Sequence, residues 1–234
     1  AILMAGHLNL DSISYGTVLE SSYGAGHDKY RDYPTLSHWR LWSRVFTGAG
    51  IPMSLPVGGV SEVGTKLILD KSFFEYLSQS CIRGKWKKPC LNCWKCFRKE
   101  LLTFGMEGVY DDNKIENLFR IKEARIFLSQ IPIKHENVIA YSVQRIESDC
   151  PTFLALKKRV IGEDVDLSWL EKWFPESIML NLEIYQNHIS SKLNEYLGPM
   201  NQSEIKALKD WNKTIFLNEQ RTLDSNKELV QLFE

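Results

Sequence analysis

The hydrophobic positions of this chain recur mostly at helical spacing. Apolar side chains three or four residues apart form one face of an amphipathic helix, and glycine or proline follows several of these runs. The pattern predicts helices over residues 38–47, 62–79, 94–104, 115–130, 178–196 and 205–215. Two short apolar runs are instead typical of buried strands, namely Ala1–Ala5 and Ile51–Val57.

The first apolar run ends in glycine and polar residues, as a strand of a parallel sheet does where it meets a ligand. We therefore expect His7 and Asp11 to lie at the carboxyl end of a strand, where they could bind substrate or transfer a proton. A loop histidine that only hydrogen-bonds the backbone is an equally good interpretation of His7. Because the chain has no initiator methionine and opens in this run, we expect it to begin inside a domain.

A change in composition between residues 105 and 113 predicts a domain boundary. Residues 1–105 would then form the last part of an α/β domain. Residues 106–234 would form a mainly helical accessory domain, which covers the site or binds a protein partner.

Charge and composition exclude several function classes for the 234 residues. Lysine plus arginine and aspartate plus glutamate both number 29, so no overall field attracts nucleic acid or a membrane surface. The apolar runs are too short for a transmembrane helix or a signal peptide. Four of the five cysteines lie within sixteen residues, which favours a metal in a reducing compartment over disulfides. We expect a cytoplasmic protein.

The clustered cysteines are Cys81, Cys90, Cys93 and Cys96. Thiolates separated by two residues can bind one zinc ion in a tetrahedral shell, and a shell of four cysteines leaves no position for a catalytic water. The spacing therefore predicts a structural zinc site. An iron–sulfur cluster and four unrelated thiols remain the alternatives. Cys150 stands apart and has no identifiable base beside it, so we interpret it as a buried or loop thiol.

From Cys81 to Lys99 inclusive the chain has seven basic residues, Arg83, Lys85, Lys87, Lys88, Lys95, Arg98 and Lys99, and no acidic residue. Four thiolates around a divalent ion carry a net charge near minus two, so these cations could simply offset that charge. Alternatively, together with Trp86 and Trp94, they could contact nucleic acid or nucleotide phosphates.

The cysteine pattern, Cys81-x8-Cys90-x2-Cys93-x2-Cys96 after a serine, resembles the zinc motif of 7-cyano-7-deazaguanine synthases. Two further segments are similar to the same family: Gly6-x4-Asp11-x3-Tyr15, and the stretch from Pro56 to Lys66. Together the matches extend from residue 2 to about residue 102.

This resemblance implies a partial doubly wound parallel sheet of the PP-loop type, also called adenine nucleotide alpha-hydrolase-like, with a zinc loop. In that family, ATP with Mg²⁺ activates a carboxylate as an adenylate, and ammonia converts it to an amide and then a nitrile. Asp11 and Tyr15 would bind substrate beside His7, and Lys66 would lie near a phosphate or support the fold. Two departures matter. Gly16-Thr17-Val18 replaces the family's Pro-Asp-Cys, so we expect a carboxylate substrate other than the usual deazaguanine. The phosphate-binding Ser-Gly-Gly-x-Asp-Ser loop is absent, so we expect the ATP-loop portion to be missing and this chain alone not to hydrolyse ATP.

Two other functions are compatible with the sequence. One is a zinc-knuckle module that binds nucleic acid, and the other is a catalytically inactive PP-loop scaffold. Gly59-x4-Gly64-Thr65-Lys66 is not a Walker A motif, because that motif needs lysine before the hydroxyl residue.

Overall fold

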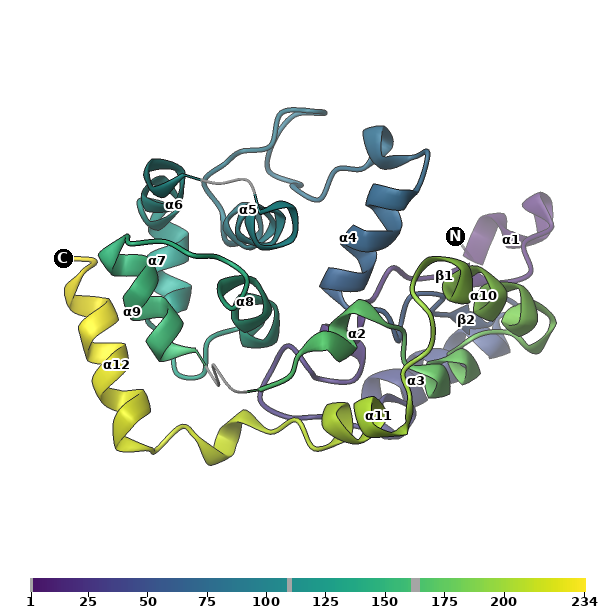
Figure 1. Cartoon of the computed structure of the whole chain (residues 1–234). Coiled ribbons are helices and arrows are strands. Elements are labelled where there is room, and N and C mark those ends of the chain that lie inside the picture. Colours follow the sequence, from purple (N-terminus) through teal and green to yellow (C-terminus); the bar gives the residue numbers. More distant parts are fainter. Residues whose placement is uncertain (1, 109–110, 161–164) are drawn as a thin grey trace. The chain divides into compact units, whose positions relative to one another are not determined.

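The computed structural model describes residues 2–108, 111–160 and 165–234 (Figure 1). The chain forms two compact units whose segments alternate along the sequence. Unit 1 contains Ala1–Ala25, Lys29–Ser72 and Ser168–Trp211, and unit 2 contains Gly26–Asp28, Phe73–Leu167 and Asn212–Glu234. Both units are mostly helical.

Unit 1 combines helices with one short sheet. Its regular elements are α1 (Ile2–Leu8), β1 (Ile13–Ser14), α2 (Leu19–Ser22), α3 (Ser37–Gly48), β2 (Met53–Ser54), α4 (Glu62–Lys71), α10 (Glu183–Tyr196), α11 (Gln202–Lys209), and the 3-10 helices Tyr33–Thr35, Ser168–Glu171 and Pro175–Leu180. Its core is aromatic, because Tyr23 and Phe174 are buried with their rings edge to face at 5.0 Å, and Trp169 is buried as well.

The predicted doubly wound sheet is wrong. The only sheet among the described residues has two strands, β1 and β2, which pair in parallel with Ile13 opposite Met53 and Ser14 opposite Ser54. Each strand has two residues, so the pair cannot form the broad apolar faces that helices cover on both sides of a doubly wound sheet. The short strand predicted within Ile51–Val57 is present as β2.

The opening apolar run is helical and is not the predicted strand. Residues Ile2–Leu8 form α1, in which the side chain of Leu3 is 96% exposed and Ala5 is buried. Alanine, leucine and methionine are strong helix formers, so the run becomes a helix where no neighbouring strand pairs with it. His7 consequently lies in the last turn of an exposed helix and does not lie at the end of a strand.

The amino end of α4 is held by buried polar groups. Ser61 is its N-cap, because its hydroxyl accepts a hydrogen bond from the amide of Gly64 at 2.8 Å. Both carboxylate oxygens of the fully buried Glu20 accept from the amide of Glu62 at 3.0 Å. A negative charge here is favourable because the first amides of a helix lack partners within it. The segment containing Gly64 and Lys66 is thus a capped helix start.

Unit 2 is a group of packed helices. Its elements are α5 (Trp94–Glu107), α6 (Asp112–Phe119), α7 (Lys122–Leu128), α8 (Glu136–Val143), α9 (Pro151–Arg159), α12 (Gln220–Gln231), and the 3-10 helices Glu75–Leu77 and Lys213–Ile215. Helix α5 packs on α8, and α9 packs on α12. Gly105 permits the contact between α5 and α8, since a Cβ atom at this position would lie 2.9 Å from the carbonyl oxygen of Ser142 in α8.

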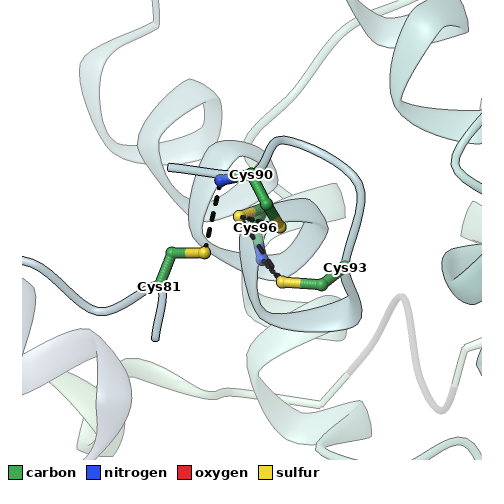
Figure 2. Close-up of side chains that lie close together, drawn as sticks. All are labelled: Cys81, Cys90, Cys93 and Cys96. Atoms are coloured by element: carbon green, nitrogen blue, oxygen red, sulfur yellow. Dashed lines mark hydrogen bonds between the residues drawn. The ribbon is translucent and has the colours of Figure 1, made fainter. Parts of the chain in front are cut away.

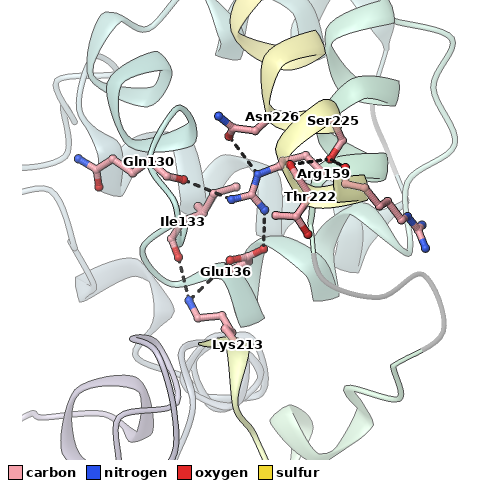
Figure 3. Close-up of polar contacts among 9 residues, drawn as sticks. Gln130, Ile133, Glu136, Arg159, Lys213, Thr222, Ser225 and Asn226 are labelled. Atoms are coloured by element: carbon pink, nitrogen blue, oxygen red, sulfur yellow. Dashed lines mark hydrogen bonds and ion pairs between the residues drawn. The ribbon is translucent and has the colours of Figure 1, made fainter. Parts of the chain in front are cut away.

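A buried ionic cluster joins three segments of unit 2 (Figure 3). The guanidinium of Arg159 and the carboxylate of Glu136 approach to 3.2 Å, and the ammonium of Lys213 lies 3.7 Å from the other oxygen of that carboxylate. All three side chains are 1% exposed. Lys213 also donates to the carbonyl of Ile133 at 2.9 Å. Burial, which disfavours the charged ammonium, lowers the pKa of Lys213 to about 8.

No helix in the described parts of the chain combines the length and the apolar character that crossing a bilayer requires.

Candidate metal centre

The structure brings the four clustered cysteines together at one end of α5 (Figure 2). Cys81 and Cys90 come from the loop before the helix, Cys93 is the N-cap of α5, and Cys96 lies in its first turn. Their four sulfur atoms all lie within 4.8 Å of one another. Cys81, Cys93 and Cys96 are buried, and Cys90 is partly exposed. This group could hold a metal ion such as zinc.

The sulfur separations match a tetrahedron around one ion. The Sγ atoms of Cys93 and Cys96 are 3.5 Å apart, and those of Cys90 and Cys96 are 3.8 Å apart. Zinc–sulfur bonds of about 2.3 Å place tetrahedral ligands about 3.8 Å apart. A disulfide needs about 2.05 Å, so these are separate thiols. The spacing of the ligands thus already suits a single zinc-sized ion.

Backbone amides point at two of the sulfurs. The amide of Cys90 donates to Sγ of Cys81 at 3.3 Å, and the amide of Cys96 donates to Sγ of Cys93 at 3.5 Å. The first of these bonds lowers the pKa of the Cys81 thiol to about 6. Burial acts in the opposite direction on Cys96, whose pKa it raises to about 12. Because metal ligation requires thiolates, an incoming cation would displace protons from this group.

The loop between Cys81 and Cys90 is shaped by its own backbone. The amide of Lys88 donates to the carbonyl of Lys85 at 2.8 Å and closes a tight turn, in which Lys87 has a φ of 59°. A Cβ atom on Gly84 would lie 2.2 Å from the carbonyl oxygen of Lys88, so the turn requires glycine there.

Gln79 braces the same loop from outside. Its side-chain nitrogen donates to the carbonyl of Cys81 at 2.9 Å, and its side-chain oxygen accepts from the amide of Lys87 at 2.6 Å. Gln79 therefore ties the first ligand to the far side of the turn. The spacing of the cysteines gave no signal for this role, since the partners are backbone atoms.

An aromatic stack fixes the first turn of α5 in the helical core. The ring of Trp94 stacks on Phe97 at 5.3 Å and on Phe127 of α7 at 5.2 Å. The guanidinium of Arg98, which is also buried, lies 5.6 Å from the Trp94 ring. This packing therefore holds in place the helix turn that carries Cys93 and Cys96. Trp94 is 5% exposed, so of the two tryptophans near the cysteines only Trp86 is at the surface.

A model of a protein family, described as a family of unknown function (DUF6395), matches residues 41–212. The chain belongs to this family. No curated protein and no solved structure matches the chain.

The DUF6395 match includes all four cysteines and Lys66, and it begins after His7, Asp11 and Tyr15. The cysteine group is therefore part of the region by which the family is recognised. The fifth cysteine, Cys150, also falls within the match and lies buried immediately before α9.

Outside the metal centre, the DUF6395 protein has a hollow of about 350 Å³ in unit 1 that Asp11 lines. The Tyr185 hydroxyl donates to an Asp11 carboxylate oxygen at 2.5 Å, and this bond raises the pKa of Tyr185. Ser14 and Ser54, the paired residues of the two strands, line the same hollow. Tyr185 comes from α10, far away in the sequence, so no local pattern predicted it.

Tyr15 lines a different hollow, of about 320 Å³, with Tyr33, His38 and Trp42. There the Tyr33 hydroxyl and Nδ1 of His38 are 2.8 Å apart and share a hydrogen bond. Asp11 and Tyr15 therefore flank β1 in separate hollows, although the sequence placed them in one site.

The remaining two predicted substrate residues line neither of these hollows. His7 is exposed in α1, and Lys66 forms an ion pair with Asp70 one turn later in α4, at 2.5 Å.

Proposed function

We propose that this DUF6395 protein binds one zinc ion through Cys81, Cys90, Cys93 and Cys96, and that the ion has a structural role. The observation that carries the proposal is the convergence of four sulfur atoms within 4.8 Å, at separations suited to the corners of one tetrahedron.

The geometry favours a single ion over an iron–sulfur cluster. In a cluster the cysteines bind different iron atoms, so their sulfurs stand farther apart than ligands that share one ion. The 3.5 Å and 3.8 Å separations suit the shared ion. Zinc is the divalent ion that most often takes four thiolates, and a complete shell gives it no open position for water or substrate.

The ion would replace a hydrophobic core that this loop lacks. The side chains of Ile82 and Leu91, which flank the ligands, are 92% and 64% exposed. Apolar burial therefore contributes little to holding the loop, and its attachment to α5 would depend on the sulfur–metal bonds.

Elemental analysis of the purified protein tests the proposal directly. We expect one zinc per chain, no iron and no labile sulfide. A single Cys96→Ser substitution should reduce zinc retention strongly, whereas Cys150→Ser should not change it, because Cys150 is outside the group. Cobalt substitution should give the visible spectrum of a tetrahedral thiolate complex. Metal-free protein, iron with sulfide, or equal retention by both variants would refute the proposal.

We propose further that the full-length protein is an ATP-dependent enzyme related to 7-cyano-7-deazaguanine synthases. One observation supports it: the cysteine spacing of that family coincides here with four converging sulfurs. The carboxylate of Asp11 and the neighbouring serines give the larger unit 1 hollow a polar lining, which suits a hydrogen-bonding substrate.

The proposed reaction begins when a substrate carboxylate attacks the α-phosphate of ATP, giving an acyl adenylate and pyrophosphate. Ammonia then displaces AMP to form an amide. Since this sequence has no Ser-Gly-Gly-x-Asp-Ser segment, the test needs the full-length protein. We expect pyrophosphate release that depends on a carboxylate substrate and AMP release that also requires ammonium, and both should fall in Asp11→Asn. Zinc-loaded protein that releases no pyrophosphate with such substrates would refute the enzymatic proposal and leave the metal proposal intact.

A further inference from the structure

Exposed aromatic and basic side chains gather around the loop that carries Cys81 and Cys90. We call this the lysine–tryptophan surface, and it consists of Phe73, Tyr76, Lys85, Trp86, Lys87, Lys88 and Lys95. Its aromatic members are unusually open to solvent, since Phe73 is 83%, Trp86 61% and Tyr76 57% exposed. Water-exposed rings of this size in one place mark a contact surface.

The rings and cations of this surface are arranged in a row. The Phe73 and Tyr76 rings lie 6.1 Å apart in an edge-to-face contact. The ammonium of Lys87 then lies 5.7 Å from the Tyr76 ring centre and 5.3 Å from that of Trp86. These contacts hold Trp86 in position while leaving most of the ring accessible.

A groove of about 280 Å³ runs beside this row. Lys87, Lys95 and Lys99 line it together with the apolar side chain of Leu91, and Glu100 is its single acidic residue. Within the described parts of the chain, Lys85, Lys88 and Lys95 form no ion pair with an acidic side chain, and all three are exposed.

The metal group accounts for only part of this charge. Four thiolates with one divalent cation carry a net charge of about minus two. Four lysines lie between Cys81 and Lys99, in a segment without acidic residues. Arg83 is paired with Glu123, and Arg98 is buried 5.6 Å from the Trp94 ring, so the excess is counted without either arginine. A positive surface therefore remains after the thiolates are neutralised.

We propose that the lysine–tryptophan surface binds single-stranded nucleic acid, with lysine ammonium groups on the phosphates and a base stacked on Trp86. Exposed rings interleaved with unpaired cations are what a flexible polyanion with flat bases requires. A duplex would leave the rings unused because its bases are already stacked. The surface rests on the proposed zinc site, because the metal would hold the loop that carries Lys85 to Lys88.

Fluorescence anisotropy with labelled oligouridylate and oligodeoxythymidylate of about 12 nucleotides tests the proposal on zinc-loaded protein. Affinity should fall as salt rises from about 50 to 200 mM, with a slope of about −0.7 per phosphate contact. Changing Lys85, Lys87 and Lys88 to glutamine should make that slope shallower by about 2. Trp86→Ala should weaken binding by about 5- to 100-fold, and Trp86→Phe should restore most of the affinity, because every base can stack on either ring.

The control variant changes Lys192, Lys206 and Lys227 to glutamine. Each of these lysines is exposed and paired with an acidic residue three or four positions away, and the control loses the same net charge as the loop variant. We expect its affinity and salt slope to match the unchanged protein. Zinc content, measured for every variant, shows that the loop remains folded.

Several results would overturn the proposal. They are zinc-loaded protein that does not bind either oligonucleotide at about 50 mM salt, a control variant that loses as much affinity as the loop variant, unchanged affinity in Trp86→Ala, and equal binding to duplex or to anionic lipid vesicles. Failure of zinc-loaded protein to bind either oligonucleotide would not contradict the zinc site, since the metal is measured separately.

Discussion

The buried ionic cluster predicts how the stability of unit 2 depends on pH. Lys213 is 1% exposed and shares the carboxylate of Glu136 with Arg159, so two cations face one buried anion. The perturbation is Lys213→Met, which removes the ammonium but keeps an unbranched apolar side chain. This change leaves the carbonyl of Ile133 without its lysine donor, which costs about 1–3 kcal/mol at every pH.

The pH-dependent part follows from the pKa of Lys213, which burial lowers from about 10.5 to about 8. That difference corresponds to about 3 kcal/mol. Below pH 8 the folded protein bears the full cost of a charged ammonium in this site. Between pH 8 and 10.5 the folded state releases the proton while the unfolded state keeps it, so the free energy of unfolding rises with pH. Methionine has no such contribution.

Urea unfolding at pH values between about 7 and 10 measures this effect as the difference in unfolding free energy between variant and unchanged protein. We expect the variant to lose up to about 3 kcal/mol relative to the unchanged protein over this range. Other titrating groups, including Tyr30 with its raised pKa of about 12, are common to both proteins and cancel. Lys227→Met, at an exposed lysine of the same unit, is the control. A pH-independent difference for Lys213→Met would refute the reasoning.

Three further substitutions test other contacts. Gly84→Ala should speed the loss of metal to a chelator, because its Cβ would lie 2.2 Å from a carbonyl oxygen of the loop; normal retention would contradict the turn geometry. Gly105→Ala should lower the free energy of unfolding by about 1–3 kcal/mol by pushing α5 away from α8, whereas Gly16→Ala, which meets nothing within 4 Å, should not. Asp11→Asn should lower the pKa of Tyr185 in an NMR titration, because a neutral amide replaces the charged carboxylate that accepts the hydrogen bond from its hydroxyl. An unchanged pKa would show that this hydrogen bond is absent in solution.

The local features of the metal centre could be predicted from the sequence, because their determinants are close together in the chain. The two Cys-x2-Cys steps fix how far apart three ligands can lie, and a turn and a helix start bring their sulfurs to one point. The helix predicted at residues 94–104 is confirmed as α5. Its end was predicted at Gly105, but the helix continues to Glu107, and Gly108 with a φ of 65° ends it. Gly105 serves the contact with α8, which sequence spacing alone does not show.

Apolar spacing was misleading where apolar residues are not buried. The helix predicted over 62–79 ends at Lys71, and Phe73, Tyr76 and Leu77, which extended its apolar face, are all exposed. Periodicity predicts a helix by assuming that one face packs against a core. Here part of that face belongs to the lysine–tryptophan surface, so the pattern reflects a contact surface and the prediction of a longer helix is wrong.

The sheet prediction failed for a related reason, since a strand is stable only with partners along its edges. The run Ala1–Ala5 has the composition of a buried parallel strand, but the same residues favour a helix when no strand lies beside them, and α1 is what the structure shows. Contacts between segments that are distant in the sequence could not be predicted either. No local pattern around Glu136 indicates that it contacts Lys213, and none around Asp11 indicates that it contacts Tyr185.

The metal centre and the lysine–tryptophan surface both require that residues 73–92 be held in one conformation without a hydrophobic core. Residues 73–92 expose large apolar and aromatic side chains, so burial of these residues stabilises the segment little. A flexible loop would lose its conformational freedom on binding a ligand and would bind weakly. Four sulfur–metal bonds, together with the brace from Gln79, would remove that freedom beforehand. If so, stripping the metal should weaken oligonucleotide binding even though every lysine and Trp86 is still present, and unchanged affinity in the metal-free protein would separate the two proposals.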